Sequence, residues 1–226
     1  KIAQTVDRLV QEKRIKPLIV AMPSAAKTWY VNSAKFGNYQ TALSQEFPKF
    51  LEASLQNLVT VDNRAIAGLS MGGYGALKYA FEAPEVFSTV AALSPAIFPN
   101  VEAVNDFKPI QIKLFAGAFG EPFSKELFND ENVFPLIDKQ KASPTTYLSV
   151  GDDDWFGLYE GTFAFYKELK DRKRTAELRI TNGNHDWKLW AEEIEPALIF
   201  IAKNFDGNIE ALKAQRTREV VFCPLK

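Results

Sequence analysis

The sequence predicts an α/β fold, in which helices cover both faces of a mostly parallel sheet. Short apolar runs alternate along the chain with segments of helical periodicity. The runs at 18–22 and 87–93 are mostly apolar, as expected for strands buried on both faces of a parallel sheet. With 226 residues and 46% hydrophobic content, the chain can also bury one substantial core.

The expected helices place apolar residues three or four positions apart, so that one face of each can pack on the sheet. They span 2–12, 39–58, 72–83, 161–173 and 188–203. Pro48 and Pro196 lie inside two of these helices, where a proline removes one hydrogen bond and crowds the preceding turn. We therefore expect a kink or a break near each proline.

The expected strands are short and rich in β-branched or other apolar residues. They span 18–22, 62–69, 87–93, 145–150 and 177–181. Helical patterns separate most of them, which favours parallel pairing through crossover connections.

One domain is expected over residues 1–203. Within it, the segment at about 96–143 alternates poorly between strand and helix and carries four prolines among scattered phenylalanines. Such a long irregular segment is typical of a functional lid or pocket wall, and the alternative is an excursion that covers a sheet edge. Residues 204–226 are polar and charged, and we interpret them as a C-terminal tail.

Composition argues against several classes of partner. The formal net charge is −1, so neither nucleic acid nor an anionic membrane surface is favoured. No apolar run approaches the ~20 residues of a membrane-spanning helix. Cys223 is the only cysteine, which excludes a disulfide framework within the chain.

The stretch from Arg64 to Ala80 carries the strongest motif, R-A-I-A-G-L-S-M-G-G-Y-G-A-L-K-Y-A. It places G-x-S-x-G between an apolar strand and a run of helix formers, which is the context of a nucleophile elbow. Ser70 is then the candidate nucleophile. The backbone N–H of Met71, at the helix start, is the candidate donor to an oxyanion. The alternative is a turn of small residues with an incidental serine.

Two further loops after expected strands carry the partners that such a serine needs. His185 is the only histidine of the chain, and it lies in a Gly/Asn loop after the last expected strand. Histidine as a residue type suits a base that takes and returns one proton, although a lone histidine is often a surface or core residue. The consecutive residues Asp152, Asp153 and Asp154 are all candidates for the acid that orients it.

Other chemistries lack the residues they require. One histidine and one cysteine disfavour a zinc site, while a calcium or magnesium site at the carboxylates of 152–154 stays open. Neither G-x-G-x-x-G nor a Walker pattern occurs, so neither a dinucleotide nor ATP is indicated. We expect no metal and no cofactor.

Five sequence blocks resemble one known family. They are K-P-L-I-V-A-M-P at 16–23, W-Y-V-N-S at 29–33, D-N-R-A-I-A-G-L-S-M-G-G-Y-G-A-L at 62–77, G-D-D-D at 151–154 and G-N-H-D-W-K-L-W at 183–190. The chain, from residue 1 to about 203, is similar to the esterase D-like branch of the α/β-hydrolases. That branch includes tributyrin-type, feruloyl and acetylxylan esterases, S-formylglutathione hydrolases and mycolyltransferases.

The resemblance implies an α/β-hydrolase fold and a serine carboxylesterase with a triad of Ser70, Asp154 and His185. Asp154 is implied because the family acid lies three residues after the glycine that ends its strand. The H-D-W block is more similar to the feruloyl, acetylxylan and tributyrin esterases. This favours a carboxylic ester with a short or aryl acyl group, linked to a small alcohol or a sugar. The alternatives are an acyltransferase acting on a sugar or lipid alcohol, and a catalytically weak binding module.

The chain departs from the family pattern at its start. Family members carry several strands and an H-G-type loop before the helix at 2–12, and that loop donates a second oxyanion N–H. Either the sequence is a fragment, or the chain lacks a donor whose loss typically costs ~100- to 1,000-fold in turnover. The family also favours Asp where this chain has Ser24. A secreted or periplasmic location is expected from the resemblance alone, and Trp29, Trp155 and Trp187 are candidate pocket walls.

Overall fold

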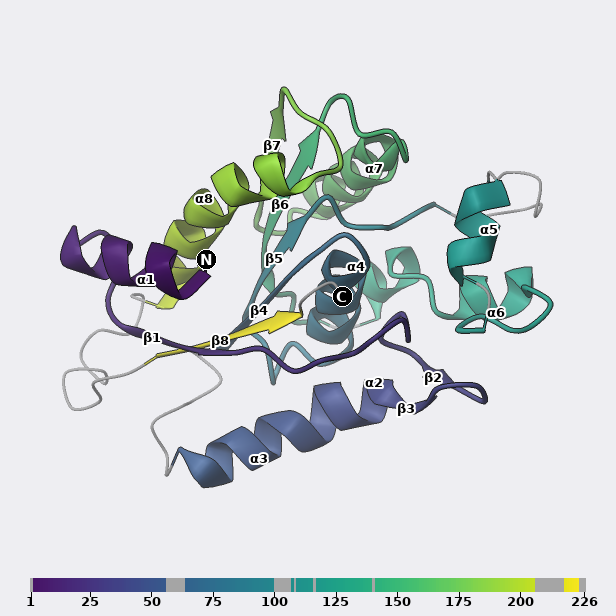
Figure 1. The fold of residues 1–226 in the computed structure, drawn as a ribbon, viewed down its shortest axis with the longest axis horizontal. Coiled ribbons are helices and arrows are strands. Elements are labelled where there is room, and N and C mark those ends of the chain that lie inside the picture. Colours follow the sequence, from purple (N-terminus) through teal and green to yellow (C-terminus); the bar gives the residue numbers. More distant parts are fainter. Residues whose placement is uncertain are drawn as a thin grey trace.

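A six-stranded parallel sheet forms the centre of the structure (Figure 1). The structure is a computed structural model that describes residues 2–55, 64–99, 107, 109–115, 117–139 and 141–205, and the backbone of 218–223. The strand order is β1-β8-β4-β5-β6-β7, and every neighbouring pair is parallel. A separate antiparallel pair, β2-β3, completes the strands of the described part. The predicted mostly parallel α/β sheet is confirmed.

All five expected strands are present. The sheet contains β1 (Leu18–Ala21), β4 (Arg64–Leu69), β5 (Thr89–Leu93), β6 (Thr145–Gly151), β7 (Ala176–Thr181) and β8 (Arg218–Cys223), and the small pair is β2 (Asn32–Ser33) with β3 (Gly37–Asn38). The residues of β1 are half-buried rather than buried, because β1 lies at the edge of the sheet in the part of the chain that the structure describes. The expected strand at 62–69 begins outside the described residues.

The expected helices are present with small shifts of their ends, and residues 56–58 of the expected helix at 39–58 lie outside the described residues. The helices are α1 (Ile2–Gln11), α2 (Tyr39–Thr41), the π-helical η1 (Ala42–Glu46), α3 (Phe47–Ser54), α4 (Met71–Glu82), α7 (Leu158–Asp171) and α8 (Trp187–Phe205). Near Pro48 the helix changes type rather than ending: the π-helical η1 lies between α2 and α3, the backbone stays helical through both junctions, and Pro48 falls in the first turn of α3. The wider π-helical turn before Pro48 accommodates a residue that has no N–H to donate. Pro196 lies inside α8.

Helices cover both faces of the sheet, and β4 shows how its residues divide between them. Ala65 and Ala67 pack on the face covered by α1 and α8, where they join Leu198. Ile66 points to the opposite face, where it packs with Leu77 of α4. Side chains of a strand alternate between the two faces, so a strand buried on both sides is apolar throughout.

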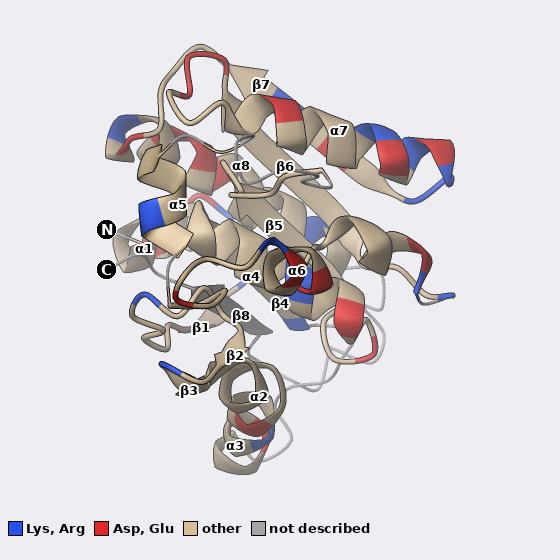
Figure 2. Cartoon of the chain, turned by 90° about the vertical axis from the view of Figure 1, so that its right-hand side faces the viewer, with Lys and Arg blue, Asp and Glu red and all other residues tan. Residues whose placement is uncertain are grey.

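Charged residues lie mainly on the outer helices and loops, with both signs interspersed along α7 (Figure 2). The central strands β5 and β6 contain no charged residue. On the outer surface Glu195 of α8 accepts hydrogen bonds from Arg8 of α1 and from Arg14, and these bonds hold the pKa of Glu195 below its ordinary value. Among the described helices, none is both long and apolar enough to span a membrane.

The described residues of the segment at 96–143 contain three short helical elements, α5 (Pro109–Phe115), α6 (Lys125–Asp130) and the 3-10 helix η4 (Phe134–Asp138). Six phenylalanines of this segment pack together with ring centroids 5.1 to 6.2 Å apart. They are Phe98, Phe107, Phe115, Phe119, Phe123 and Phe128. Six of the seven phenylalanines at 96–143 therefore form one aromatic cluster, while Phe134 packs on Phe165 of α7.

This segment is also tied to α4 by buried polar contacts. The Lys78 ammonium lies 2.6 Å from a carboxylate oxygen of Glu82 and 2.6 Å from one of Glu131. The Tyr74 hydroxyl donates to the carbonyl oxygen of Glu131 over 2.8 Å. Burial raises the pKa of Tyr74 well above its ordinary value, so this donor stays protonated. These contacts fix the segment against the helix that follows Ser70.

The expectation of a polar tail after residue 203 requires a correction. Helix α8 continues to Phe205, and the segment 218–223 forms β8 in the middle of the sheet, between β1 and β4. The sequence R-E-V-V-F-C of β8 contains a short apolar run within charged surroundings. The pairing register places Cys223 beside Gly68, two residues before Ser70.

Candidate active site

Ser70 lies at the sharp turn between β4 and α4, with a backbone φ of 53° and ψ of −119°. This conformation is strained for a residue with a side chain, so the surrounding hydrogen bonds must hold it. The Ser70 N–H donates to the carbonyl oxygen of Leu93 over 2.8 Å. The Ser70 carbonyl accepts from the N–H of Tyr74 at 3.1 Å and from that of Ala96 at 3.0 Å. Neighbouring backbone thus fixes the turn.

Two glycines give this turn the space it needs. A Cβ atom on Gly68 would lie 2.1 Å from the carbonyl oxygen of Gly72, a separation that no pair of non-bonded atoms tolerates. A Cβ atom on Gly73 would lie 2.9 Å from the Cα atom of Pro95, in the segment that leaves β5. The glycines of the motif therefore allow the strand, the turn and the helix to pass closely.

The structure brings Ser70, His185 and Asp154 together at the carboxyl ends of β4, β7 and β6. The Oγ atom of Ser70 lies 2.8 Å from Nε2 of His185, and Nδ1 of His185 lies 2.7 Å from Oδ2 of Asp154. The exposed side-chain fraction is 8% for His185 and 0% for Asp154. The three side chains form one continuous line of hydrogen bonds that is largely shielded from water.

Of the three consecutive aspartates, Asp154 is the one that contacts the imidazole. Its other oxygen, Oδ1, accepts the N–H of Phe156 over 2.9 Å, which fixes the orientation of the carboxylate. Asp152 instead accepts the N–H of Gly183 over 3.1 Å, and Asp153 is exposed. Asp152 therefore holds together the two loops that carry Asp154 and His185.

Asn184 is a site residue to which we assigned no role from the sequence. Its Oδ1 atom accepts the N–H of His185 at 2.8 Å and that of Trp155 at 3.2 Å. One amide oxygen therefore links the loop after β7 with the loop after β6. The signal that could have indicated it is its position directly before the only histidine.

Two aromatic rings enclose the imidazole edge-on, and these contacts were also missed. The ring centroids of Phe156 and Trp190 each lie 4.9 Å from that of His185, at interplanar angles of 78° and 85°. The indole Nε1 of Trp190 donates to Oγ of Ser94 over 3.1 Å. Trp190 is thereby anchored to the end of β5 while its ring limits the rotation of His185.

Glu193 of α8 supports the two strands that lead to these loops. Tyr147 of β6 donates its hydroxyl to one carboxylate oxygen of Glu193 over 3.1 Å, and Thr181 of β7 donates to the other over 3.2 Å. Burial raises the pKa of Tyr147, with a smaller contribution from the charge of Glu193, so its hydroxyl remains a donor. Glu193 therefore helps to fix the relative position of the two loops that carry Asp154 and His185.

A cavity of about 270 Å³ opens beside Ser70 and His185. Its other lining residues are mostly apolar: Lys27, Trp29, Met71, Ala96, Phe98, Gln111, Leu114, Phe115, Phe156, Leu158 and Trp190. Trp29 lines the cavity, in agreement with the expectation for a pocket wall. Trp155 and Trp187 are not part of its lining and are instead exposed, by 58% and 59%. That part of the expectation was wrong.

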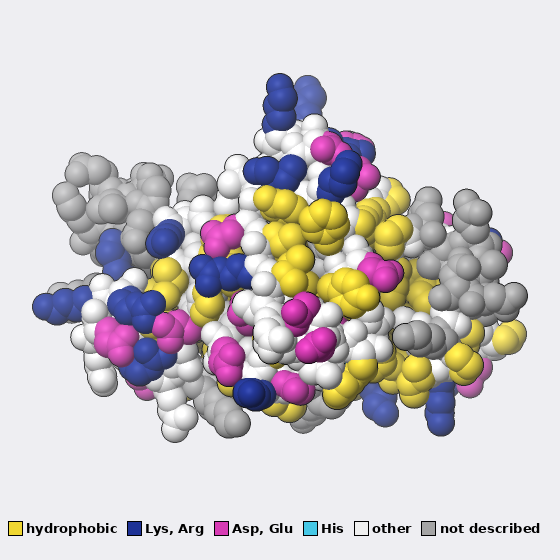
Figure 3. All heavy atoms as spheres, turned by 90° about the horizontal axis from the view of Figure 1, so that it is seen from above, with side chains coloured by type: hydrophobic (Ala, Val, Ile, Leu, Met, Phe, Trp, Pro, Cys, Tyr) yellow, Lys and Arg dark blue, Asp and Glu magenta, His cyan; other side chains and the backbone are white. Residues whose placement is uncertain are grey.

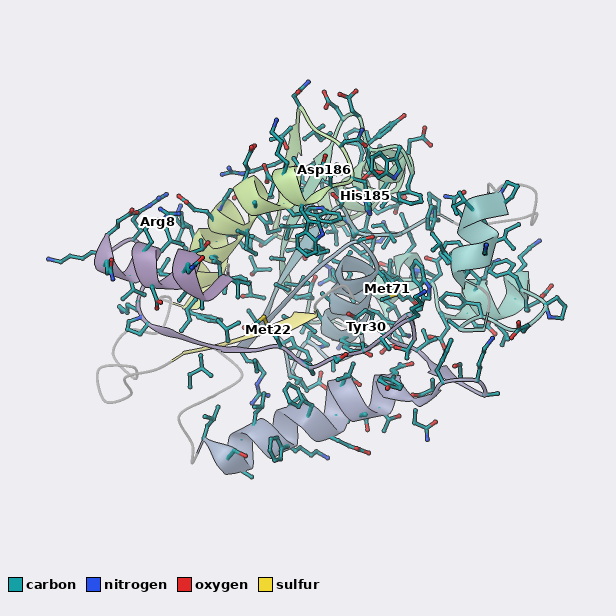
Figure 4. All side chains as sticks on the ribbon, viewed as in Figure 1. Arg8, Met22, Tyr30, Met71, His185 and Asp186 are labelled. Atoms are coloured by element: carbon teal, nitrogen blue, oxygen red, sulfur yellow. The ribbon has the colours of Figure 1, made fainter. Side chains whose placement is uncertain are left out.

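Met71 occupies the first position of α4 and faces the same cavity (Figure 4). Its backbone N–H makes no hydrogen bond with the described residues. The positive end of the helix dipole lies at this N–H, which favours an oxygen that carries negative charge. The described residues contain no group of three or more His, Cys, Asp or Glu side chains that could hold a metal ion.

Comparison with known proteins agrees with this architecture. Residues 1–201 match the family described as "Putative esterase". The chain belongs to this family. As a member of an esterase family, it is an enzyme that hydrolyses ester bonds.

Individual relatives are similar to this esterase either at low sequence identity over most of the chain or at higher identity over a short stretch. An acetyl esterase of Caldicellulosiruptor saccharolyticus is 24% identical over 211 residues, which are 88% of this chain and 77% of that protein. Esterase Rv1288 of Mycobacterium tuberculosis is 41% identical over 70 residues, which are 29% of this chain and only 15% of that protein. The solved structure of a ferulic acid esterase superposes with a TM-score of 0.67 at 22% identity, over 89% of this chain and 76% of that one. The expected α/β-hydrolase fold is confirmed.

Proposed function

We propose that this esterase is a serine carboxylesterase in which Ser70, His185 and Asp154 act as the catalytic triad. The observation that carries the proposal is the line of hydrogen bonds from Ser70 Oγ through His185 to Asp154, at 2.8 and 2.7 Å, beside an apolar cavity. A serine hydroxyl is a weak nucleophile until a base within this distance accepts its proton.

The carboxylate of Asp154 sets the tautomer of the imidazole. When Nδ1 of His185 donates its hydrogen to Asp154, Nε2 is left as an acceptor that faces Ser70. His185 takes the serine proton as Ser70 Oγ bonds to the ester carbonyl carbon, and it then delivers that proton to the departing alcohol. Water next attacks the acyl-enzyme, with His185 again as base, and the acid is released.

The backbone N–H of Met71 stabilises the charge that develops on the carbonyl oxygen. It stands at the start of α4, directly after the nucleophile, where the helix dipole adds to its effect. The reaction requires only these groups and water, so we propose no cofactor.

The cavity favours acyl groups that are small or aromatic. Trp29, Phe98 and Phe115 line it, and the last two belong to the segment at 96–143. We therefore propose that this segment is the lid-like wall of the acyl pocket. The names of the acetyl esterase and the ferulic acid esterase that resemble this chain are consistent with acetate and aryl esters, linked to a small alcohol or a sugar.

The test is hydrolysis of p-nitrophenyl acetate, p-nitrophenyl butyrate and methyl ferulate by the chain and by the Ser70→Ala variant. We expect release of the acid from at least one ester, and loss of that activity in the variant. The melting temperature of both proteins is the control for folding. Equal rates for the two proteins, or no hydrolysis by the intact chain, would refute the assignment of Ser70.

A further inference from the structure

One basic side chain borders the cavity beside Ser70 and has no part in the chemistry proposed above. Lys27 lines that cavity together with Ser70, Met71 and His185. Apart from the imidazole of His185, no other lining residue that the structure describes has a side chain that can carry a charge near neutral pH. The cavity therefore has one cationic side chain among walls that are mostly apolar.

The loop that carries Lys27 has an unusual backbone conformation. It follows the carboxyl end of β1 and runs between the labelled residues Met22 and Tyr30 in Figure 4. Ala26, Trp29 and Tyr30 all adopt a positive φ, at 47°, 53° and 57°. Residues with a side chain rarely adopt this region, and such strain persists mainly where the surrounding structure enforces it, often at binding sites. The fold thus specifies this loop closely.

Hydrogen bonds on both sides of Lys27 hold the loop in place. The hydroxyl and the N–H of Thr28 both donate to the carbonyl oxygen of Ala25, over 2.7 and 3.3 Å. The indole Nε1 of Trp29 donates to the carbonyl oxygen of Leu114 in α5 over 2.9 Å, and Leu114 also lines the cavity. The loop is therefore attached to the opposite wall of the cavity, which keeps Lys27 at its border.

Lys27 is exposed, and its ammonium makes no hydrogen bond or ion pair with the described residues. Basic side chains elsewhere do have acidic partners. Arg8 and Arg14 both pair with Glu195, and Figure 3 shows a face of the molecule on which basic and acidic side chains lie next to one another. The charge of Lys27 is thus open to a ligand in the cavity.

The reaction determines which part of an ester faces this charge. The carbonyl carbon must lie at Oγ of Ser70, and the departing oxygen must lie within hydrogen-bond reach of Nε2 of His185. The remainder of the acyl group then occupies the cavity that Lys27 borders. An ammonium group has three donors and no acceptor, and its strongest hydrogen bonds are those to a carboxylate.

We propose that Lys27 selects acyl groups that carry a carboxylate at the end distant from the ester, so that the substrate is a monoester of a dicarboxylic acid. The apolar walls contact the carbon skeleton between the two ends, while the ammonium binds the free carboxylate. This inference rests on the proposed function, because it takes Ser70 as the point of attack. The bonds that form and break are those of the ester hydrolysis described above.

Two pairs of methyl esters test this role, because within a pair only the charge of the distal group changes. One pair is monomethyl glutarate and methyl 4-carbamoylbutanoate, and the other is monomethyl terephthalate and methyl 4-carbamoylbenzoate. For each ester, kcat/KM is measured by methanol release with the intact chain, Lys27→Gln and Lys27→Glu. Lys113→Gln is the matched control, since Lys113 is exposed on α5, its replacement changes the net charge equally, and it does not line the cavity.

We expect the carboxylate-to-amide ratio of kcat/KM to fall about threefold or more in Lys27→Gln for at least one pair, as the loss of a charged hydrogen bond at a partly exposed site implies. In Lys27→Glu the ratio should fall further, and methyl 4-(aminomethyl)benzoate should become a better substrate than methyl 4-carbamoylbenzoate. Lys113→Gln should leave both ratios within about twofold. A smaller fall for both pairs in Lys27→Gln, or an equal fall in Lys113→Gln, would overturn the proposal.

A binding measurement separates failure of this inference from failure of the proposed function. The Ser70→Ala variant lacks the proposed nucleophile, so its affinity for the four esters can be measured by calorimetric titration, with and without Lys27→Gln. We expect it to bind an ester with a carboxylate more tightly than the matching amide, and Lys27→Gln to remove this preference.

Equal affinities within both pairs would overturn the role of Lys27. If the proposed function alone is wrong, hydrolysis does not depend on Ser70, but the preference in binding remains. If the inference alone is wrong, hydrolysis still depends on Ser70, and the preference for the carboxylate is absent.

Discussion

Replacement of Asp154 by Asn tests how the orientation of one buried carboxylate controls which imidazole nitrogen of His185 can accept the Ser70 proton. In the structure Oδ1 of Asp154 accepts the N–H of Phe156 over 2.9 Å, while Oδ2 faces Nδ1 of His185 at 2.7 Å. The single oxygen of an asparagine would stay with the Phe156 N–H, because that donor accepts no hydrogen bond. The amide NH₂ group would then face His185.

This arrangement would reverse the roles of the two imidazole nitrogens. Nδ1 would have to accept from the asparagine, so the hydrogen would move to Nε2, which then could not take the Ser70 proton. In serine hydrolases the loss of the correct tautomer costs about 10⁴-fold in kcat with the geometry intact. We expect a loss of this order here, equivalent to about 5 kcal/mol of transition-state stabilisation.

The assay is the pre-steady-state and steady-state hydrolysis of p-nitrophenyl acetate, with the melting temperature as a check of the fold. Asp152→Asn is the matched control, since an amide oxygen can still accept the Gly183 N–H, now 3.1 Å from Asp152. We expect this control to retain kcat within about threefold, in line with surface substitutions that keep their contacts. The reasoning would be wrong if Asp154→Asn kept kcat within tenfold, or if Asp152→Asn lost as much.

Four further predictions follow from the packing around the site and the sheet. Gly68→Ala would force a Cβ atom against a carbonyl oxygen at 2.1 Å, so we expect a loss of about 3 kcal/mol or more in unfolding free energy, measured by urea denaturation. Ser94→Ala removes the oxygen that accepts the Trp190 indole N–H and should lower kcat about two- to tenfold with little change in KM. A rise in KM by as large a factor as the fall in kcat would argue against a positioning role for Trp190. Glu195→Gln should make the melting temperature decline less steeply at acid pH. The arginine partners of Glu195 lower its pKa, so its contribution to stability is present above the unfolded pKa and is lost as pH falls through the folded pKa. A variant whose melting temperature declines as steeply as that of the parent between pH 5 and pH 2 would contradict this. Deletion of 206–226 removes the strand between β1 and β4, and calorimetry should show a melting temperature lower by more than 10 °C, whereas an unchanged transition would exclude a central role for β8.

The sequence was most informative where a residue type has few possible roles. The glycines around Ser70 and the alternation of apolar runs with helical patterns allowed the fold class to be predicted, because close approach and burial restrict these positions to few residue types. His185 was the only available imidazole. The catalytic roles of Ser70, His185 and Met71 stay predictions, although the geometry of the described residues is compatible with each of them.

Other features depend on contacts that one sequence does not reveal. Three consecutive aspartates differ only in backbone direction, so residue types alone could not distinguish Asp154 from its neighbours. The role of Asn184 depends on two loops that meet only in the folded chain. The strand β8 was missed because its apolar run is short and lies among charged residues, and its pairing partners are distant in sequence.

The position of β8 also sets the order of events when the chain is synthesised. Leu18 of β1 pairs with Arg218, so among the described strands the neighbour of β1 is synthesised long after β1 itself. The edge of β4 that pairs with β8 stays unpaired until the same strand has been synthesised. Translation from the end of β4 to Cys223 takes roughly 8 to 30 s at cellular rates. During that time an open, apolar strand edge is exposed in the nascent chain, which makes it a substrate for chaperones and a point of aggregation.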